Sequence, residues 1–403
     1  MKKVVVIGAG HGGVQVAASL RDEGFEGEIV LISEEKELPY QKPPLSKGFL
    51  QGKQTEVSIL FRSEQYYVSN AIDLRLGVTI ASINPKENYI STVNGEKIDF
   101  TYLILATGAA NRKLRFDGKE PKNVYYLRTL SDAKWIGQQL ESANNVVIVG
   151  GGFIGLELAA LAVEKGKKVT VIEAQSRLME RVLPEVISKV FYETHIQKGA
   201  KVYLGACVNG IQDNGDVVLS TGEALPSDLI LAGIGVIPET QLAKEAGIIC
   251  ENGIVVNELQ QTSIPNIYAI GDVANHYNPF AKKNLRLESV QNAVDQAKTA
   301  AAHILGKAVP YNAVPWFWTF QYHLKLQMAG ISLGYDDYVV RGDTASGKFS
   351  IYYYKEGKLI GVDSLNKPAD HLNARKLLEL GIHPAKEEIR DLSLSLKELV
   401  SVS

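Results

Sequence analysis

Apolar, β-branched residues open the chain and are followed by glycines and a helical run. The residues Val4 to Ile7 are all β-branched, the stretch Gly8 to Gly13 is rich in glycine, and a helical pattern extends from Val14 to Arg21. A continuous apolar run of this kind is typical of a parallel strand that is buried on both faces. A second such run, Ile29 to Ile32, ends at Ser33-Glu34. The opening is therefore predicted to be a strand, a glycine turn, a helix and a second strand.

The glycine spacing in this first turn fits the G-x-G-x-x-G pattern of a dinucleotide-binding fold. Gly8 permits the tight turn, Gly10 lets the backbone approach a pyrophosphate, and Gly13 lets the helix pack closely on the strand. The first N–H groups of the helix have no helical partner, so they can donate to phosphate oxygens. The carboxylate of Glu34 can accept the ribose hydroxyls of an adenosine. These features predict one nucleotide site.

Residues 146–173 repeat the opening pattern. The strand Val146 to Val149 leads into Gly150 to Gly155, and a helix is predicted from about Leu156 to Lys165. The strand Lys168 to Ile172 then ends at Glu173. Because the same unit occurs twice, we expect two nucleotides, one at each turn.

The acid of the second unit bears on which pyridine nucleotide binds there. Glu173 should accept a free 2′-hydroxyl and repel a 2′-phosphate, which favours NADH over NADPH. Arg177 lies close to the same strand end and would soften this preference.

The segment between the two units contains a proline loop and a strand-rich stretch. Two consecutive prolines within Leu38 to Lys47 exclude a helix interior and a central strand, so we predict a stiff loop that leads into a short helix at Ser46. Strands are expected within Val78 to Ile90 and Lys97 to Leu105. The small residues Ala106-Thr107-Gly108 follow and would let the backbone crowd against a neighbour or a ligand.

Beyond the second unit, two further strands end in glycine. One lies within Asp228 to Gly235, and the other, Ile264 to Ile270, ends in Gly271-Asp272 before a helix predicted from Leu287 to Leu305. Ligands of α/β sheets bind at the carboxyl ends of the strands, so Asp272 could accept hydroxyls of a ribityl chain. The alternative is that Asp272 only caps the segment that follows.

The pattern changes at Trp316. Short alternating runs up to Val362, with glycine turn signals, predict strands, and helical patterns follow at about Pro368 to Leu380 and Leu394 to Leu399. The whole pattern predicts an α/β fold with two Rossmann-like nucleotide-binding domains and a C-terminal α+β domain.

Composition and charge narrow the class of protein. A chain of 403 residues should form two or three domains, and its net charge of −2 gives no overall attraction to nucleic acid or to membranes. No apolar run approaches the roughly 20 residues of a membrane span, and no signal peptide is evident. A reducing, cytoplasmic setting is expected. The cysteines Cys207 and Cys250 are interpreted as buried thiols, and no metal site is expected.

The histidines offer little candidate chemistry. His11 occupies a variable position of the first glycine turn and is interpreted as loop filler in preference to a catalyst. His195, His276, His323 and His371 show no pattern of acid–base partners.

These residues together resemble the FAD-dependent pyridine nucleotide-disulfide oxidoreductase superfamily. Within it they look like the NADH:ferredoxin reductases of bacterial oxygenase systems, the putidaredoxin reductase-like group. The matching stretches span nearly the whole chain: Pro44 to Lys47, Leu103 to Gly108, Tyr126 to Thr129, Gly150 to Glu157, Ala232 to Pro238, Ala269 to Asp272, Glu288 to Ala293 and Pro315 to Trp318.

The resemblance implies a glutathione reductase-like fold of three domains. Residues 1–109 and 236–313 would form a discontinuous FAD-binding domain, residues 110–235 an NADH-binding domain, and residues 314–403 an α+β domain of the interface type that covers the flavin. FAD would be the cofactor and NADH the co-substrate, in a monomer or a homodimer.

The resemblance also implies roles for single residues. Lys47 would lie near the flavin N5 edge, and Glu157 would lie near the nicotinamide, paired with Lys47; these two are the expected catalytic residues. The expected cofactor-binding residues are Gly8, Gly10, His11, Gly12, Gly13, Glu34, Lys47, Ile80, Ala106, Thr107, Gly108, Arg128, Gly150, Gly152, Phe153, Ile154, Gly155, Glu157, Glu173, Gly235, Gly271, Asp272, Val290 and Trp318.

One position departs from the family pattern. Relatives usually carry a small hydroxyl residue and then an acid after Trp316-Phe317-Trp318, whereas this chain has Thr319-Phe320. The change alters the surface on which a partner would dock. Trp318 is either a core aromatic of the third domain or a lid over the flavin.

Cysteine usage and the resemblance together lead to the functional prediction. Disulfide-reducing relatives carry cysteines close behind the first fingerprint, where this chain has none, so a thiol relay is excluded. We expect hydride transfer from NADH to FAD and then single-electron transfer to a [2Fe–2S] ferredoxin that supplies a cytochrome P450. The ferredoxin could dock on Arg62, Lys298, Lys325 and Trp318. The alternative is that Arg62, Lys298 and Lys325 are ordinary solvated charges.

Alternative functions stay open at this point. The chain could serve a Rieske dioxygenase, or be an NADH oxidase or quinone reductase. A non-enzymatic NADH sensor similar to apoptosis-inducing factor is a further alternative.

Overall fold

The computed structural model describes residues 1–115 and 121–401. Within them the chain forms two compact units, each assembled from segments that are separated in the sequence. The first unit comprises Met1–Gln41, Val57–Ala110 and Pro238–Phe317. The second comprises Lys42–Glu56 and the described parts of Asn111–Ile237 and Trp318–Ser403. The expected division into three domains stays a prediction.

The first unit is built on a parallel sheet with the strand order β19-β7-β1-β2-β3. Val5 of β1 lies beside Val30 of β2 on one side and beside Leu103 of β7 on the other. Because these strands run parallel, their carboxyl ends lie at one edge of the sheet. The strands are β1 (Lys3–Ile7), β2 (Glu28–Ile32), β3 (Ile72–Arg75), β7 (Tyr102–Leu105) and β19 (Ile267–Ala269).

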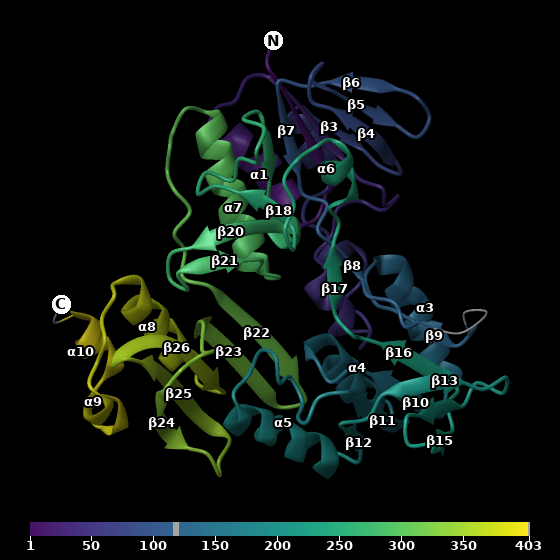
Figure 1. Ribbon diagram of the computed structural model, residues 1–403, viewed down its shortest axis with the longest axis vertical. Coiled ribbons are helices and arrows are strands. Elements are labelled where there is room, and N and C mark those ends of the chain that lie inside the picture. Colours follow the sequence, from purple (N-terminus) through teal and green to yellow (C-terminus); the bar gives the residue numbers. More distant parts are fainter. Residues whose placement is uncertain (116–120, 402–403) are drawn as a thin grey trace. The chain divides into compact units, whose positions relative to one another are not determined.

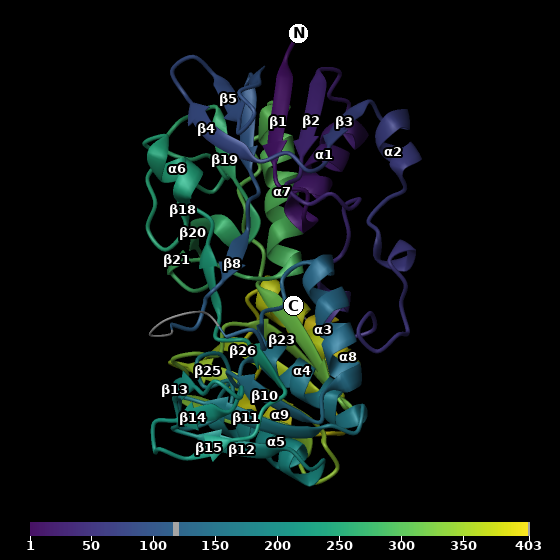
Figure 2. The same cartoon turned by 90° about the vertical axis from the view of Figure 1, so that its right-hand side faces the viewer.

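Both faces of this sheet are buried, which explains its continuous apolar strands. Val4 and Val6 of β1 pack with the helices α1 (His11–Asp22) and α7 (Val290–Ile304). Val5 packs on the opposite face with residues of a small antiparallel sheet, β4-β5-β6. Figures 1 and 2 show α1 and α7 side by side.

The remaining elements of the first unit are short. They are η2 (Val57–Ile59), α2 (Glu64–Ser69), β4 (Ile80–Asn84), β5 (Tyr89–Thr92), β6 (Lys97–Asp99), α6 (Gln241–Glu245), β18 (Ile254–Val256), η3 (Gly271–Val273), β20 (Ala274–Asn278) and β21 (Lys283–Leu285). The strands β8 (Ala109–Asn111) and β17 (Val236–Pro238) lie where the chain passes from one unit to the other.

The second unit contains a parallel sheet of the same kind, with the strand order β12-β11-β10-β16-β9. Its strands are β9 (Val124–Tyr125), β10 (Asn145–Val149), β11 (Lys168–Glu173), β12 (Lys201–Leu204) and β16 (Leu229–Ala232). Its helical segments are η1 (Pro43–Ser46), α3 (Leu130–Ser142), α4 (Phe153–Glu164) and α5 (Glu185–Gln197). A small antiparallel sheet follows, with β13 (Val208–Ile211), β14 (Val217–Leu219) and β15 (Ala224–Leu225).

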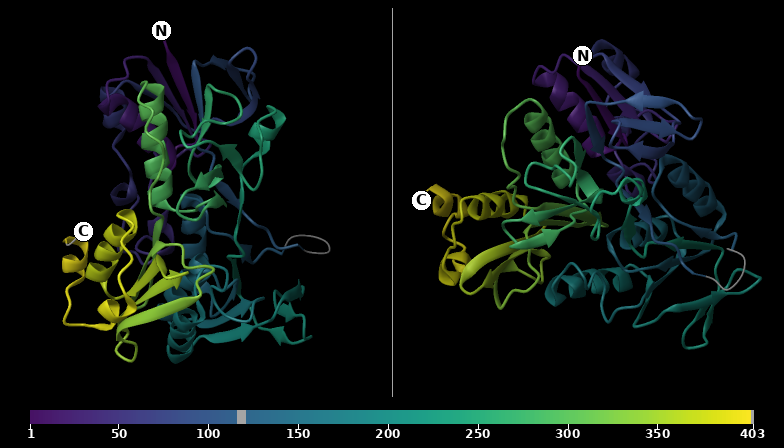
Figure 3. Two further views of the ribbon diagram at one scale, coloured as in Figure 1. Left: turned by 60° about the vertical axis from the view of Figure 1, so that its left-hand side comes forward. Right: turned by 45° about the horizontal axis from the view of Figure 1, so that its top comes forward.

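The C-terminal part of the second unit is a sheet with the order β22-β23-β26-β25-β24, covered by helices. The strands are β22 (Trp316–Gln321), β23 (Leu324–Gly330), β24 (Asp337–Asp343), β25 (Lys348–Lys355) and β26 (Lys358–Leu365). The helices are α8 (Pro368–Glu379), α9 (Lys386–Arg390) and α10 (Leu396–Ser401). Helix α8 packs on β23 and β26, and Figure 3 shows the yellow helices against the yellow-green sheet.

Several element boundaries differ from the sequence-based expectation. The helix after the second glycine turn begins at Phe153 rather than Leu156, because the turn feeds directly into it from the N-cap Gly152. Helix α7 begins at Val290, after its N-cap Ser289 accepts a hydrogen bond from the backbone of Asn292. The short helix expected at Ser46 instead ends there, because proline is tolerated in the first turn of a helix.

The interpretation of the two cysteines as buried thiols is wrong. Cys207 is exposed, and Cys250 is partly exposed. Cys207 lies in the short turn after β12, where the backbone at Gly205 has a positive φ and the sheet edge faces solvent. Among the helices of residues 1–115 and 121–401, none combines the length and the apolar character that a membrane crossing requires.

Candidate functional site

The first glycine turn joins β1 to α1 at the carboxyl edge of the sheet of the first unit. Gly8 has a φ of 104°, and a Cβ there would lie 2.3 Å from the carbonyl oxygen of Ala106. A Cβ on Gly13 would lie 1.8 Å from the carbonyl oxygen of Gly8, so the helix can approach the strand only with glycine there. In contrast, a Cβ on Gly10 would meet no atom within 4 Å. The space beside Gly10 is therefore open to a ligand.

Other expected FAD contacts of the first unit lie at the same sheet edge. Glu34 follows β2 and is exposed, Ala106 to Gly108 follow β7, and Gly271-Asp272 follow β19. The amide of Gly271 donates to Oε1 of the buried Gln296 at 2.7 Å, which fixes the backbone beside Asp272. Parallel strand direction thus brings together groups that are far apart in the sequence.

The remaining expected residues of the first unit lie on neighbouring elements. His11 begins α1, and its ring meets that of Phe61 edge to face with centroids 4.7 Å apart. Ile80 begins β4, and Val290 begins α7. The hydroxyl of Thr107 donates to the carbonyl oxygen of Glu239 at 2.9 Å.

The second glycine turn, in the second unit, has nearly the same geometry. Gly150 has a φ of 106°, and a Cβ there would lie 2.5 Å from the carbonyl oxygen of Gly233. A Cβ on Gly155 would lie 2.1 Å from the carbonyl oxygen of Gly150, whereas a Cβ on Gly152 would meet nothing within 4 Å. Both turns therefore use one glycine for the turn and one for helix packing, and leave the middle glycine open.

Glu173 ends β11 and faces the second turn. Its carboxylate accepts hydrogen bonds from the amides of Gly151, at 2.6 Å, and Gln175, at 2.7 Å. Arg177 points elsewhere, because its guanidinium donates to the carbonyl oxygens of Leu183, at 2.5 Å, and Glu180, at 3.0 Å. The guanidinium is thus engaged by backbone rather than presented to the turn.

The other expected cofactor-binding residues of the second unit surround this turn. Phe153 and Ile154 form the first positions of α4, and Gly235 follows β16 with a φ of 100°. The amide of Arg128 donates to Asp132 at 3.0 Å, in the capping box that begins α3. Arg128 is therefore anchored at the start of this helix.

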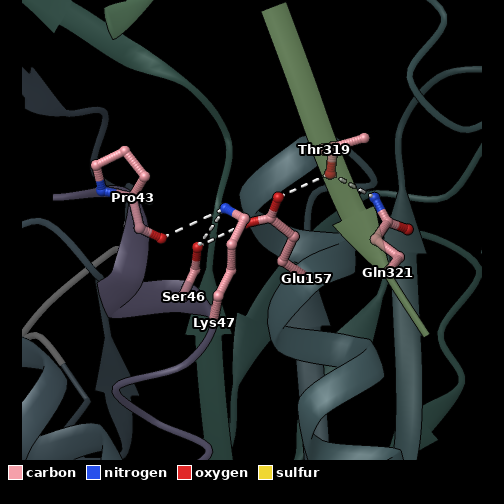
Figure 4. A network of polar contacts seen from close by, with 6 residues as sticks. All are labelled: Pro43, Ser46, Lys47, Glu157, Thr319 and Gln321. Carbon is pink, nitrogen blue, oxygen red and sulfur yellow. Dashed lines mark hydrogen bonds and ion pairs between the residues drawn. The ribbon is translucent and has the colours of Figure 1, made fainter. Parts of the chain in front are cut away.

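Glu157 is the buried centre of a polar network that Figure 4 shows. Its Oε2 accepts hydrogen bonds from the ammonium of Lys47, at 2.7 Å, and from the hydroxyl of Ser46, at 2.5 Å. Its Oε1 accepts from the hydroxyl of Thr319 at 2.7 Å. Only 2% of the Glu157 side chain is exposed, against 21% for Lys47. The expected Lys47–Glu157 pair is thus present, and each carboxylate oxygen has a donor.

Three segments of the chain meet at this carboxylate. Helix α4 supplies Glu157, the η1 turn supplies Ser46 and is followed by Lys47, and β22 supplies Thr319. The rigid turn at Pro43 also accepts a hydrogen bond from Lys47 Nζ at 3.4 Å. A buried carboxylate requires such partners, because an unpaired buried charge is strongly unfavourable.

The network continues beyond Thr319 to a buried histidine. The side-chain nitrogen of Gln321 donates to the Thr319 hydroxyl at 3.3 Å, and its oxygen lies 2.9 Å from Nε2 of His195. The hydroxyl of Tyr322 lies 3.4 Å from Nδ1 of the same ring. Burial lowers the pKa of His195, against a smaller raising effect of Gln321, so the ring is neutral at pH 7.

The opposite face of β22 presents a different surface. Trp318 is half-buried and Phe320 is 41% exposed, and the ammonium of Lys325 lies 5.9 Å from the centroid of the Phe320 ring. Two of the expected docking residues, Trp318 and Lys325, thus lie in the second unit. The other two, Arg62 and Lys298, are exposed in the first unit.

Sequence reasoning missed Ser46, Thr319, Gln321, His195 and Tyr322 as parts of one network. One signal was available, because Thr319 and Gln321 are polar at alternate positions of a strand and both are fully or almost fully buried. No signal linked His195 to Gln321, which lies 126 positions away.

The two turns fit the nucleotide groups that the sequence predicts. Gly10 and Gly152 are the N-caps of α1 and α4, and a Cβ on either would meet no atom within 4 Å, so each leaves room beside the backbone. Helix amides with no helical partner next to open space suit a pyrophosphate. Glu34, which follows β2, and Glu173, which ends β11, are placed to accept hydrogen bonds from ribose hydroxyls.

Comparison with known protein families finds two matches along the chain. The family described as pyridine nucleotide-disulphide oxidoreductase matches residues 2–297, and the family described as reductase C-terminal matches residues 316–400.

Individual proteins are similar over almost the full chain. Rhodocoxin reductase of Rhodococcus erythropolis is 41% identical over 398 residues, which cover 98% of this chain and 93% of the relative. The ferredoxin reductase subunit of 5,5′-dehydrodivanillate O-demethylase from a Sphingobium species is 40% identical over 403 residues, covering 98% of both chains. The crystal structure of the ferredoxin reductase for the CYP199A2 system of Rhodopseudomonas palustris has a TM-score of 0.97 at 42% identity, over 99% of this chain and 100% of that one.

Proposed function

Because this chain belongs to the pyridine nucleotide-disulphide oxidoreductase family, we propose that it is an NADH-dependent reductase of a [2Fe–2S] ferredoxin that supplies a cytochrome P450. Membership makes the protein an oxidoreductase that uses FAD and NADH. Support for the ferredoxin comes from relatives of 40% and 42% identity that are ferredoxin reductases. Support for the P450 comes from the relative that serves the CYP199A2 system.

The observation that carries the proposal is the Lys47–Glu157 pair behind the first fingerprint. In relatives that reduce disulfides, this region carries cysteine, whereas here the η1 turn leads to Lys47, whose ammonium lies 2.7 Å from Glu157. Neither Cys207 nor Cys250 is near it in the sequence, and they belong to different units. Electrons must therefore leave without a dithiol, which suits a one-electron carrier.

We assign the two glycine turns to the two nucleotides. The turn Gly8 to Gly13, with Glu34 and Asp272, would hold FAD, and the turn Gly150 to Gly155, with Glu173, would hold NADH. When bound, FAD supplies a flavin that takes a hydride from NADH and releases electrons singly. The protein contributes mainly by holding the reactants in position.

Lys47 and Glu157 would then act electrostatically rather than as acid and base. The Lys47 ammonium can stabilise negative charge that develops close to it. Glu157 fixes that ammonium, and Ser46 and Thr319 fix Glu157. Because a buried carboxylate with a full set of donors does not reorient, the positive charge stays at one place during turnover.

Stopped-flow mixing of the FAD-loaded protein with NADH tests the first half of the proposal. We expect rapid loss of the oxidised flavin absorbance, and a rate constant roughly 10²-fold lower in Lys47→Gln, which removes one electrostatic stabiliser. Lys189→Gln, which removes an exposed cation of the second unit, is the control and should react like the wild type. A flavin that stays oxidised with NADH would refute the proposal.

Ferredoxin specificity tests the second half. A [2Fe–2S] ferredoxin of a P450 system should be reduced with a higher kcat/KM than a Rieske-type ferredoxin, while disulfides and quinones should be poor acceptors. A preference for the Rieske-type carrier would assign the protein to a dioxygenase or demethylase system instead. This second assignment is supported by the relative that is the ferredoxin reductase subunit of an O-demethylase.

A further inference from the structure

The polar network around Glu157 is a chain of hydrogen bonds whose direction can be worked out. It runs from Glu157 through Thr319 and Gln321 to His195 and then to Tyr322. Counted over the whole residue, Glu157 is 4% exposed and Gln321 is 1% exposed, and Thr319 and His195 are fully buried. Water therefore does not compete for these partners, and each group must satisfy its donors and acceptors within the chain.

The proton of Thr319 fixes the first step. The Glu157 carboxylate carries the charge that pairs with Lys47, so it can only accept, and the Thr319 hydroxyl must donate its single proton to Oε1. That hydroxyl oxygen can then only accept from Gln321. The side-chain nitrogen of Gln321 must therefore face Thr319, because the flipped amide would set two acceptors against each other 3.3 Å apart.

The orientation of Gln321 fixes the histidine in turn. Its oxygen faces His195 at 2.9 Å, so Nε2 of the ring must carry a proton. Burial keeps the ring neutral, which leaves Nδ1 as an acceptor for the Tyr322 hydroxyl. Every donor in the chain thus points toward Glu157.

We propose that His195 is a positioning residue for Glu157, held as the neutral Nε2–H tautomer and acting through Gln321 and Thr319. The inference rests on the proposed function, because it assigns to a remote ring the task of orienting the carboxylate that fixes Lys47. The chain is not a proton path, since the amide of Gln321 does not readily pass a proton from one end to the other. The hydrogen bonds instead orient and polarise the donors, so that the Thr319 hydroxyl points at Oε1 of Glu157.

The backbone conformation of Tyr322, at the far end of this series of hydrogen bonds, supports the positioning role. Tyr322 has a φ of 52° in the two-residue connection between Gln321, the last residue of β22, and Leu324, the first residue of β23. A left-handed backbone is unfavourable for a residue other than glycine or asparagine. The turn nevertheless sets the Tyr322 hydroxyl against His195, with the rings edge to face and centroids 5.1 Å apart.

The tautomer can be read directly from nitrogen-15 NMR of histidine-labelled holoenzyme, in which His195→Gln identifies the ring among the seven histidines. We expect a protonated Nε2 and an unprotonated Nδ1 in the wild type. A protonated Nδ1 with a bare Nε2, or a doubly protonated ring at pH 7, would overturn the proposal. This readout needs no turnover, so it stands even if the ferredoxin assignment fails.

Paired substitutions test whether the chain acts on the reaction. Thr319→Ser and His195→Gln keep a donor at the critical position, whereas Thr319→Val and His195→Leu remove it. We expect the two that remove it to lower the rate constant of flavin reduction by about tenfold at saturating NADH, since a hydrogen bond to a charged group is lost or loosened. The two that keep it should retain most of the rate.

The KM for NADH should change little in all four variants, because the nucleotide-binding turn is untouched. His323→Gln, an exposed histidine of the same connection, is the matched control. Bound FAD and the thermal midpoint of each variant separate misfolding from mispositioning. If His195→Leu folds and reduces its flavin at the wild-type rate while Glu157→Gln is slow, the positioning role is refuted. If Glu157→Gln is also as fast as wild type, the proposed function of Glu157 fails instead.

Discussion

At the residue scale, Asp363 is a buried acid outside the candidate site, and we expect it to make the stability of the protein depend on pH. It lies in β26 and is 2% exposed, and its Oδ2 accepts a hydrogen bond from the Tyr353 hydroxyl at 2.8 Å. Burial raises the pKa of Asp363 to about 7, against a smaller lowering effect of the Tyr353 bond. An unfolded aspartate titrates near pH ~3.9. The folded state therefore binds this proton more tightly than the unfolded state.

The sign of the pH dependence follows from that difference. Below pH ~4 the tighter binding of the Asp363 proton stabilises the folded state in full. This stabilisation is lost as the pH rises to about 7, by at most roughly 1.4 kcal/mol per pH unit. Asp363→Asn keeps an acceptor for Tyr353 but does not titrate. We therefore expect the free energy of unfolding of wild type, relative to Asp363→Asn, to fall between pH ~4 and ~7 and to level off above. Denaturant titrations of both proteins at several pH values measure this, and a constant difference would contradict it.

At the same scale, we expect Glu173 rather than Arg177 to set the preference for NADH over NADPH. Glu173 faces the second glycine turn, whereas the guanidinium of Arg177 is engaged by two backbone carbonyls. We expect Glu173→Gln to raise kcat/KM for NADPH relative to NADH by about tenfold, because a repulsion of roughly 1 to 4 kcal/mol with the 2′-phosphate is removed. Steady-state kinetics with both nucleotides give the ratio.

Arg177→Lys serves as the comparison for that prediction. Since Arg177 does not face the turn, the ratio of the two nucleotides should stay within about twofold of wild type, a difference of under 0.5 kcal/mol. A large loss of NADPH activity in Arg177→Lys would show that this side chain reaches the nucleotide after all.

At the element scale, different glycines of each turn serve helix packing and ligand binding. Gly155 is needed for α4 to approach its strand, whereas Gly152 has a φ of −83° and open space around it. An alanine at Gly152 therefore causes neither strain nor a clash within the protein. An alanine at Gly155 forces the helix away from the sheet.

The paired substitutions should give opposite signatures. Gly152→Ala should leave the thermal midpoint of the NADH-free protein within about 2 °C of wild type, a change of under 1 kcal/mol, and should raise the KM for NADH. Gly155→Ala should lower the midpoint of the same protein by several degrees, because overpacking costs about 1 to 3 kcal/mol. Calorimetry and initial rates distinguish the two, and equal midpoints would contradict the packing role of Gly155.

The same two turns show which features the local sequence can predict. Apolar runs and glycine spacing predicted both turns, because strand propensity and the positive φ of a glycine depend on residues close together in the sequence. The Lys47–Glu157 pair was expected only from the resemblance. The contacts of Glu157 with Thr319, and of His195 with Gln321, join positions that only the tertiary fold brings together. The exposure of Cys207 likewise depends on where a sheet ends rather than on the residue type.

At the scale of the whole molecule, association with a carrier protein must depend on local charge. The net charge of −2 provides no general attraction, so any steering arises from small clusters such as Lys325 beside Phe320. We propose that this surface contributes to ferredoxin docking. Phe320 is uncharged, so the ammonium of Lys325 is the charge that this pair of side chains would present to an acidic partner.

Salt dependence tests that surface. If the ferredoxin is acidic, kcat/KM for its reduction should fall as ionic strength rises, whereas kcat/KM for NADH with a small acceptor should change much less. Lys325→Glu should weaken ferredoxin reduction about tenfold at low salt and flatten the salt dependence. Lys348→Glu, on another strand of the same sheet, controls for net charge. Equal effects of the two substitutions would argue against a docking role for Lys325.

The interleaving of the two units has a consequence for biosynthesis. The strands β1 and β2 leave the ribosome early, but their sheet lacks β19 (Ile267–Ala269) and the covering helix α7 (Val290–Ile304) until most of the chain has been made. At translation speeds of about 5 to 20 residues per second, this interval lasts roughly 15 to 50 s. During that interval α1 covers only part of the sheet face that α1 and α7 share in the folded protein. Because the expected FAD contacts Asp272 and Val290 are also synthesised late, we expect FAD to bind only after most of the chain has been made.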